Sequence, residues 1–436
     1  MREITNHSIM KIIQSREVRA CLVALLSFLV ALLSFLVSLP AYSSRRTGIT
    51  ELARRVFEVA SFQAKMVASN LDSTSLPKSI APDGTLRKTV WQDWVSGFYP
   101  GTLWFIYKYS GDPEIARLAE EQTEKCSRVQ YLRSTHDVGF MINCSYGNGL
   151  RLGGIDEYAE VLHNAAHSLV TRYNPLVGCI KSWEDNRSRG WYYPVIIDNM
   201  MNLELLVRVA EMFDEPNLLA VALSHADVTM KNHFREDGSS FHVVNYDPET
   251  GKPLSGETAQ GYSDGSTWAR GHAWGFYGYT MMADLTGEER YLRKAEELAL
   301  WTIRNLPEDH VQYWDYTAAA RLLADEPGLD RKWAGEMPDG TILRDASAAA
   351  ITASAFARLG KICPDRKMAK LFRETALKQV EALSSPDYLA EPGTNCGFLL
   401  KHSTGAYHAA SEVDVPLTYA DYYYLEAILR LLDEIQ

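Results

Sequence analysis

Two kinds of helical stretch alternate along this chain, and this alternation constrains the fold more than any other feature of the sequence. The first kind is amphipathic, with charged residues on one face, and occurs at residues 50–71, 114–129, 157–173, 218–234, 291–306 and 366–383. The second kind is poor in charge and rich in Gly, Ala and aromatic residues, and occurs at residues 96–111, 136–150, 198–213, 269–285, 345–360 and 418–434. The first pattern is typical of helices with one exposed face, and the second of helices buried on most sides.

This alternation predicts an all-α fold, the (α/α)6 barrel, in which six inner helices are covered by their neighbours and by six outer ones. Residues 238–267 are the expected exception, because residues 241–246 alternate like a strand and turn signals follow them. Such an insertion more often shapes a site than builds a core. Residues 189–206, in which Asp198 lies among apolar residues, otherwise suit a buried helix. Since the inner helices begin at one common end, polar residues at their starts are expected to share a cavity.

The N-terminal segment has the layout of a secretory signal peptide. Lys11, Arg16 and Arg19 precede a long uncharged run that ends in small residues. We therefore expect residues 1–43 to direct export, with the periplasm as the destination, and residues 44–436 to form a single catalytic domain, since no linker divides them. The apolar run is also long enough for an uncleaved membrane anchor, which is the alternative.

Charge and cysteine usage exclude several classes of function. The chain has a formal net charge of −11, and residues 1–43 are themselves basic, so the remainder is more acidic and does not suit a nucleic-acid partner. Five cysteines follow residue 43, without a C-x-x-C pair, so at least one is unpaired and no metal site is indicated. Nucleotide-binding, zinc-protease and serine-hydrolase motifs are absent, and we expect no cofactor. The sequence does not predict an oligomeric state.

Two aspartates at the starts of inner helices are the candidate catalytic pair. Asp137 and Asp198 each suit a helix N-cap, which is the simpler interpretation. Their neighbours His136 and Asn199, however, supply more polar groups than a cap needs. Two carboxyl groups in one enclosed cavity do not both ionise readily, so one pKa should rise and provide a general acid near neutral pH. Asp345 begins another inner helix and is interpreted as a cap.

A second cluster lies at residues 266–280. Arg270 and Trp274 are four residues apart and therefore share one helix face. Arg270 could bind the carboxylate of a ligand, with the indole as a stacking surface for a sugar, or it could pair with a carboxylate inside the core. The aromatic residues Trp91 and Trp183 suit either a core or a sugar platform.

The chain resembles the unsaturated glucuronyl hydrolases of glycoside hydrolase family 88. The resemblance extends from "WVSGFYPGTLW" through "THDVGFM", "IIDNMMNLELL", "FHVVNYDPETG", "ETAQGYSDGSTWARGHAWGFYGY" and "CGFLLKHSTG" to "VDVPLTYADYYYLEAILR". It implies an (α/α)6 barrel and substrates made by polysaccharide lyases, namely acidic oligosaccharides whose non-reducing end is a uronic acid with a C4=C5 double bond. Sister enzymes that act on pectin fragments, the unsaturated rhamnogalacturonyl hydrolases, are an alternative. A non-catalytic periplasmic glycan-binding barrel and a sugar epimerase are less compatible with the paired aspartates.

The resemblance also implies roles for individual residues. Asp198 matches the proton donor, and Asp137 matches its partner carboxylate. The residues that match groups around the unsaturated uronate are His242, Gly256, Thr258, Gln260, Arg270 and Trp274, and those that match aromatic walls are Trp91 and Trp183. In the C-terminal loop, Lys401, His402 and Ser403 could serve an anionic group of the next sugar, although the residues after them do not fit a dedicated sulfate pocket.

Overall fold

The computed structural model describes residues 48–435. The predicted signal peptide, residues 1–43, lies outside this range. The chain divides into two units, Met1–Arg54 and Arg55–Gln436. Of the first unit, residues 48–54 are described, and they are helical. No helix within residues 48–435 is long and apolar enough to cross a membrane.

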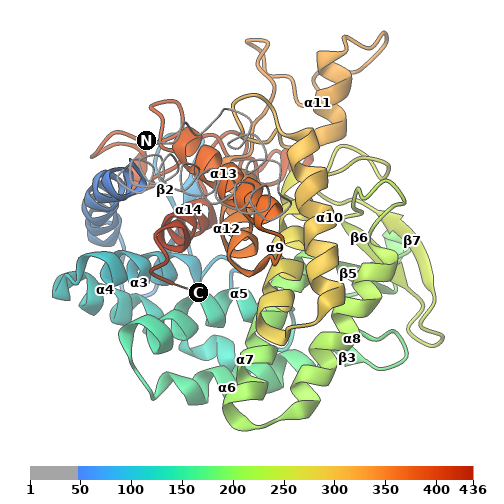
Figure 1. Cartoon of the computed structure of the whole chain (residues 1–436), viewed down its shortest axis with the longest axis horizontal. Helices are drawn as coiled ribbons and strands as arrows, with labels where there is room; N and C mark the ends of the chain where they lie inside the picture. The colour runs from blue at the N-terminus through green and yellow to red at the C-terminus, as the bar shows by residue number, and fades with distance from the viewer. Residues whose placement is uncertain (1–47, 436) are drawn as a thin grey trace, which may run out of the picture. The chain divides into compact units, whose positions relative to one another are not determined.

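The larger unit is built from two sets of helices (Figure 1). The outer set is a helix over residues 55–69, α4 (Pro113–Glu124), α6 (Tyr158–Val170), α8 (Pro216–Asn232), α10 (Glu289–Asn305) and α13 (Arg366–Leu383). The inner set is α3 (Phe98–Ser110), α5 (Val138–Ile142) with the π-helical turns η2 (Asn143–Gly147) and η3 (Gly149–Gly153), the 3-10 segment η5 (Ile197–Asn202) with α7 (Leu203–Phe213), α9 (Ala269–Thr286), α12 (Ala346–Ile362) and α14 (Thr418–Leu431). All twelve predicted helical stretches are present within the described residues.

The inner helices form a closed ring. In chain order each packs against the next: α3 against η2, α5 against η5, η5 and α7 against α9, α9 against α12, and α12 against α14. Contacts between α14 and α3 close the ring, and Figure 1 shows α14, α12 and α9 side by side. Outer helices lie against the inner helices that they follow or precede in the chain, as in α9 with α10 and α12 with α13. The predicted (α/α)6 barrel is confirmed.

Glycines on α9 let η5 approach it closely. A Cβ atom on Gly275 would lie 2.7 Å from the Ile197 side chain, and one on Gly278 would lie 2.5 Å from Met200 Cβ. Distances this short are not tolerated between carbon atoms, so a larger residue at either position would push η5 away. This packing holds the segment that carries Asp198 against the helix that carries Arg270.

The interpretation of residues 189–206 as one buried helix is wrong. Tyr193–Ile196 form strand β5, and the helical backbone begins only at Ile197. Pro194 and the β-branched Val195 and Ile196 favour an extended chain over a helix. Strand β5 pairs with β6 (Val243–Tyr246), and β6 pairs with β7 (Pro253–Glu257), both antiparallel. The predicted strand at 241–246 is thus confirmed, within a sheet that also recruits residues before the insertion.

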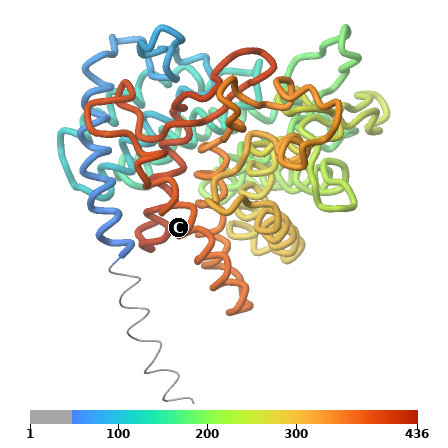
Figure 2. Tube along the Cα trace, turned by 90° about the horizontal axis from the view of Figure 1, so that it is seen from above, coloured from blue at the N-terminus to red at the C-terminus, as the bar shows by residue number. Residues whose placement is uncertain are grey.

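Smaller elements were not predicted. They include two hairpins, β1 (Leu76–Ile80) with β2 (Leu86–Thr89) and β3 (Tyr173–Asn174) with β4 (Cys179–Ile180), and the helix α11 (Tyr316–Leu323). Figure 2 shows the long loop before α14 at the end of the barrel opposite the C-terminus. Backbone bonds tie this loop to the start of α12, because Ala346 N donates to His402 O at 3.0 Å. Inner-helix starts and the C-terminal loop therefore meet at one end.

Candidate active site

Asp198 is a buried carboxyl group at the start of an inner helix. It is the second residue of η5, and its side chain is 12% exposed. Its Oδ1 atom has no hydrogen-bond partner among the described residues. Burial raises the pKa of Asp198 to about 7, against the opposing effect of the Arg270 cation and with a contribution from the Asp137 carboxylate. A carboxyl group in this state is part protonated near neutral pH and can act as a general acid.

Asp137 lies at the start of α5, the inner helix that packs against η5. It occupies the N-cap position, but its side chain accepts no bond from the helix, so the simpler interpretation as a cap does not explain it. Instead, Thr135 Oγ1 donates to Asp137 Oδ2 at 2.6 Å, and His136 Nε2 lies 3.3 Å from Oδ1. Burial lowers the pKa of His136, which favours its neutral form. Asp137 is therefore oriented by polar neighbours and is close enough to Asp198 to influence its ionisation.

His242 lies beside Asp198, and Trp183 packs on His242. His242 Nε2 is 3.7 Å from Asp198 Oδ1, and Ala259 N donates to its Nδ1 at 3.1 Å. Burial lowers the pKa of His242 well below its ordinary value, so the ring is neutral. The ring of Trp183 meets that of His242 edge to face at 5.6 Å. The structure thus brings three predicted site residues together. Asp198 comes from η5, His242 directly precedes β6, and Trp183 lies in the segment before β5.

Arg270 is engaged by protein groups. One of its terminal nitrogens donates to Asp345 Oδ2 at 2.8 Å and to Thr404 O at 2.5 Å, and the other donates to Gly405 O at 2.6 Å. Three of the five N–H groups are used in these bonds. The interpretation of Asp345 only as a cap needs correction: its Oδ1 does accept from Ser347 N, but its Oδ2 holds Arg270. Arg270 links the C-terminal loop to the inner-helix starts, and its side chain is 1% exposed.

Aromatic side chains line the same region. Trp274 is fully buried, with its ring 5.1 Å from Phe140 and 5.3 Å from Tyr423, and its Nε1 has no partner among the described residues. Sequence reasoning missed Trp94 and Tyr419, whose rings lie 4.9 Å apart. Both lie near inner-helix starts, which is the signal that identified the aspartates. Trp91, by contrast, is half-buried and takes no part in the ring contacts of this cluster.

The insertion residues play structural parts that sequence reasoning did not anticipate. A Cβ on Gly256 would lie 2.8 Å from the Phe241 ring, so only glycine fits there. Thr258 Oγ1 accepts from Gly261 N at 2.9 Å and so holds a turn. Gln260 Nε2 donates to Gly405 O at 3.0 Å, the same carbonyl that Arg270 contacts. Gln260 therefore connects the insertion to the C-terminal loop.

The C-terminal loop contributes Ser403. Ser403 is buried, its Oγ has no partner among the described residues, and its backbone pairs with Val415. His402 is partly exposed, and its Nδ1 is hydrogen-bonded to Asp414 Oδ1 at 2.7 Å. Glu412 was also missed; it lies 3.7 Å from both Lys78 and Arg87 and close enough to influence Arg270.

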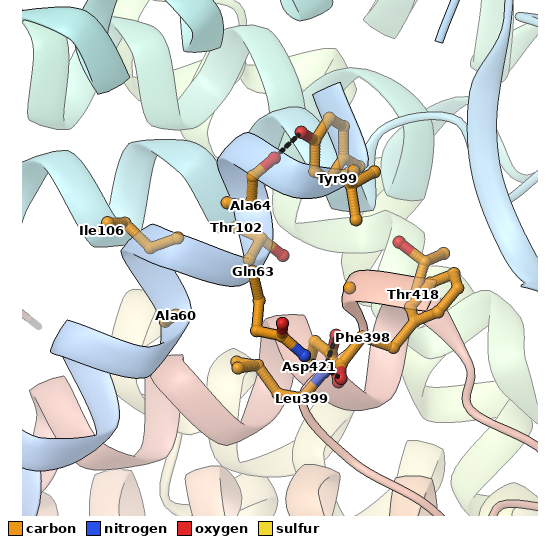
Figure 3. A pocket seen from close by; sticks show the side chains of 12 residues that line it. Ala60, Gln63, Ala64, Tyr99, Thr102, Ile106, Phe398, Leu399, Thr418 and Asp421 are labelled. Atoms are coloured by element: carbon orange, nitrogen blue, oxygen red, sulfur yellow. Dashed lines mark hydrogen bonds between the residues drawn. The ribbon is translucent and has the colours of Figure 1, made fainter. Parts of the chain in front are cut away.

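A separate pocket lies between the helix over 55–69, α3, α14 and the 397–399 segment (Figure 3). Its lining includes Asp421 but neither Asp137 nor Asp198. Asp421 accepts from Leu399 N at 2.8 Å and Leu400 N at 2.9 Å, and burial raises its pKa to about 7. Asp421 is thus a further buried acid, and it holds Leu399 and Leu400 of the C-terminal loop against α14. Among residues 48–435 no other carboxylate contributes to its raised pKa, and its pocket excludes both candidate catalytic aspartates.

No family model matches the chain. It is 38% identical over 371 residues to an unsaturated glucuronyl hydrolase of Formosa agariphila, covering 84% of this chain and 87% of the relative. The chain belongs to the unsaturated glucuronyl hydrolase family. A second relative in this family, an unsaturated chondroitin disaccharide hydrolase of Streptococcus pneumoniae, is 31% identical over 78% of this chain and 81% of its own length.

Solved structures agree with this family membership. A crystal structure of an unsaturated glucuronyl hydrolase specific for heparin matches with a TM-score of 0.80 and 41% identity, over 88% of this chain and 97% of that one. A mutant of the Streptococcus agalactiae unsaturated glucuronyl hydrolase, complexed with dGlcA-GalNAc6S, matches with a TM-score of 0.70 and 25% identity, over 88% of this chain and 92% of that one. The chain is therefore a glycosidase of this family, and the expected fold and enzyme class are confirmed.

Proposed function

We propose that this enzyme removes the 4,5-unsaturated uronic acid from the non-reducing end of glycosaminoglycan-type oligosaccharides released by lyases, with Asp198 as the proton donor. The observation that carries the proposal is the buried carboxyl group of Asp198, whose pKa is about 7, beside Asp137 at the common end of the inner helices. An acid that keeps its proton near neutral pH suits a substrate whose reactive bond is a carbon–carbon double bond.

The reaction follows from the electronic structure of the sugar. The unsaturated ring is an enol ether, so protonation at C4 by Asp198 places positive charge at C5, shared with the ring oxygen. The Asp137 carboxylate stabilises this charge. Ionised Asp198 then takes a proton from water as the water adds to C5. The resulting hemiketal opens to a C5 ketone and releases the remaining sugar from C1. Arg270, which keeps two N–H groups outside its protein bonds, is assigned to the substrate carboxylate.

Substitution of Asp198 by Asn tests the proton donor. The variant should fold and bind but lose about two to four decades of kcat, because an amide cannot donate this proton. Loss of the double bond's ultraviolet absorbance measures turnover, and a variant with most of its activity would remove Asp198 from this role. Thr135→Ala is a matched variant that keeps both aspartates but removes the bond to Asp137 Oδ2, so it should lose less activity.

A substrate panel tests the glycan class. Unsaturated disaccharides from heparin, chondroitin and pectin fragments should be compared by kcat/KM. The proposal predicts a preference for glycosaminoglycan disaccharides, as the names of the relatives suggest. A preference for pectin fragments would instead favour the rhamnogalacturonyl hydrolase alternative.

Export to the periplasm is part of the proposal. It is supported by the basic residues and uncharged run within residues 1–43. Mass spectrometry of the N-terminus of protein recovered from the periplasm should find a chain that begins near residue 44. Full-length protein recovered from the membrane fraction would favour the anchor alternative.

A further inference from the structure

We propose a binding site for a divalent transition-metal cation, of the zinc class, formed by His163, His167 and Glu215. The three side chains offer His163 Nε2, His167 Nε2 and a Glu215 carboxylate oxygen within 4.8 Å of one another. They come from α6 and from the residue that precedes α8, whereas the catalytic aspartates come from the starts of α5 and η5. The site therefore does not belong to the active site described above.

The spacing of the ligand atoms suits a tetrahedral ion. His163 Nε2 and His167 Nε2 are 3.3 Å apart. Two nitrogens bound at about 2.0–2.1 Å to a tetrahedral zinc ion lie about 3.3 Å apart, so the two imidazoles need little movement. Glu215 Oε1 is 2.5 Å from His163 Nε2, and Oε2 is 2.9 Å from His167 Nε2. A ligand oxygen of a tetrahedral zinc ion would lie about 3.3 Å from each nitrogen, so the Glu215 carboxylate has to withdraw by several tenths of an ångström, which rotation of its side chain allows.

Each ligand is held by its surroundings. The histidines are four residues apart on α6, which places them on one helix face. The His163 ring packs on Phe213, with ring centroids 4.4 Å apart. Glu215 is fixed on both sides, because Asp214 before it adopts the left-handed conformation that ends α7 and Pro216 after it begins α8. Such positioning lowers the entropy lost when an ion binds.

The donor set defines the class of ion. Two imidazoles and one carboxylate favour Zn²⁺, Co²⁺, Ni²⁺ or Cu²⁺ over Mg²⁺ and Ca²⁺, which prefer oxygen ligands. The side chains of His163, His167 and Glu215 are 30%, 50% and 29% exposed, so solvent can reach the site and water can complete the coordination. An ion here would join the α6 helix to the α7–α8 turn and stabilise the outer layer of the barrel.

Calorimetric titration of the untagged, chelator-treated chain tests the site. ZnCl₂ should bind once per chain at micromolar or lower concentration, CoCl₂ should give the visible absorbance of a histidine-bound ion, and MgCl₂ should not bind. His167→Ala and Glu215→Ala should each weaken zinc binding about tenfold or more. His402→Ala is the matched control, since it removes a partly exposed histidine that pairs with a different carboxylate, and it should bind zinc like the parent.

Thermal unfolding provides a second measurement that does not depend on activity. Zinc should raise the melting temperature of the parent chain and of His402→Ala, but not that of the two ligand variants. Circular dichroism without metal checks that those variants fold. The proposal is overturned if zinc does not bind saturably below about 100 μM, a concentration typical of weak surface sites, or if either ligand variant binds as tightly as the parent. In that case the cluster is a hydrogen-bonded His–Glu group.

Discussion

Asp198→Asn should make the protein inactive and, above acidic pH, more stable. The substitution nearly conserves the volume of the side chain and removes its ability to ionise. In the folded protein the pKa of Asp198 is about 7, against an ordinary value of 3.8. Each pKa unit corresponds to about 1.36 kcal/mol, so the difference destabilises the folded parent by about 4 kcal/mol once both states are ionised. With the side chain 12% exposed, entry of water reduces this penalty, and we expect about 2–4 kcal/mol.

The sign of the effect sets its pH window. Below pH 3.8 the carboxyl group is protonated in both the folded and the unfolded chain, so its ionisation does not affect the free energy of unfolding. As the pH rises toward about 7, the unfolded chain releases the proton while the folded chain keeps it, and the parent loses stability. The Asn variant lacks this loss. The difference in unfolding free energy between variant and parent should therefore grow between about pH 4 and pH 7 and then stay constant.

Urea unfolding of parent and variant at about pH 4 and pH 8 measures this difference. Asp421 also has a pKa of about 7, but it is present in both proteins, so its contribution cancels in the comparison. The stability difference between variant and parent should be larger at pH 8 than at pH 4. If it is not, the inference that burial keeps Asp198 protonated is refuted. Lost activity without a gain in stability would point to a role other than proton donation from a raised pKa.

Three further predictions concern the acid and its supports. The kcat of the parent should fall as the pH rises through about 7, because Asp198 must be protonated to act, and a pH-independent kcat between about pH 5 and 9 would contradict this. Arg270→Lys should raise KM and lower the melting temperature, because one ammonium nitrogen cannot occupy both guanidinium nitrogen positions, of which one bonds Asp345 and Thr404 O and the other Gly405 O; steady-state kinetics and thermal melts check both effects. Asp421→Ala should cost about 2–4 kcal/mol in urea unfolding at about pH 4, where its raised pKa makes little difference, since two buried backbone N–H groups lose their acceptor, and an unchanged midpoint at that pH would contradict it.

The helices and their alternation could be predicted because they depend on local periodicity. Charged faces and Gly- and Ala-rich stretches report burial residue by residue, and the closed ring follows from burying six such stretches. The same rule located Asp137 and Asp198, since inner helices begin at one end. The prediction of a helix over residues 189–206 was wrong because apolar character does not distinguish a buried helix from a buried strand. The deciding partner, β6, lies about fifty residues away in the chain.

The partners of charged and polar side chains could not be predicted either, because they too are far apart in the sequence. Arg270 and Asp345 are 75 residues apart, and Gln260 reaches a carbonyl 145 residues away. No local pattern encodes such pairs, so Asp345 was interpreted only as a cap. Trp274 has the predicted position one helical turn from Arg270, yet its complete burial depends on Phe140 and Tyr423 from two other helices. Sequence indicated a candidate site, and tertiary packing determines which contacts each side chain makes there.

The protonation state of Asp198 can be observed directly by infrared difference spectroscopy between about pH 5.5 and pH 8.5, a range that spans a pKa of about 7. The parent should show the carbonyl band of a buried, protonated carboxyl group that disappears with a midpoint near pH 7. One component of that band should be missing in Asp198→Asn and present in Asp421→Asn. If the difference spectra of parent and Asp198→Asn are identical, Asp198 does not change its protonation between about pH 5.5 and pH 8.5, which contradicts a pKa of about 7 and the role of the proton donor built on it.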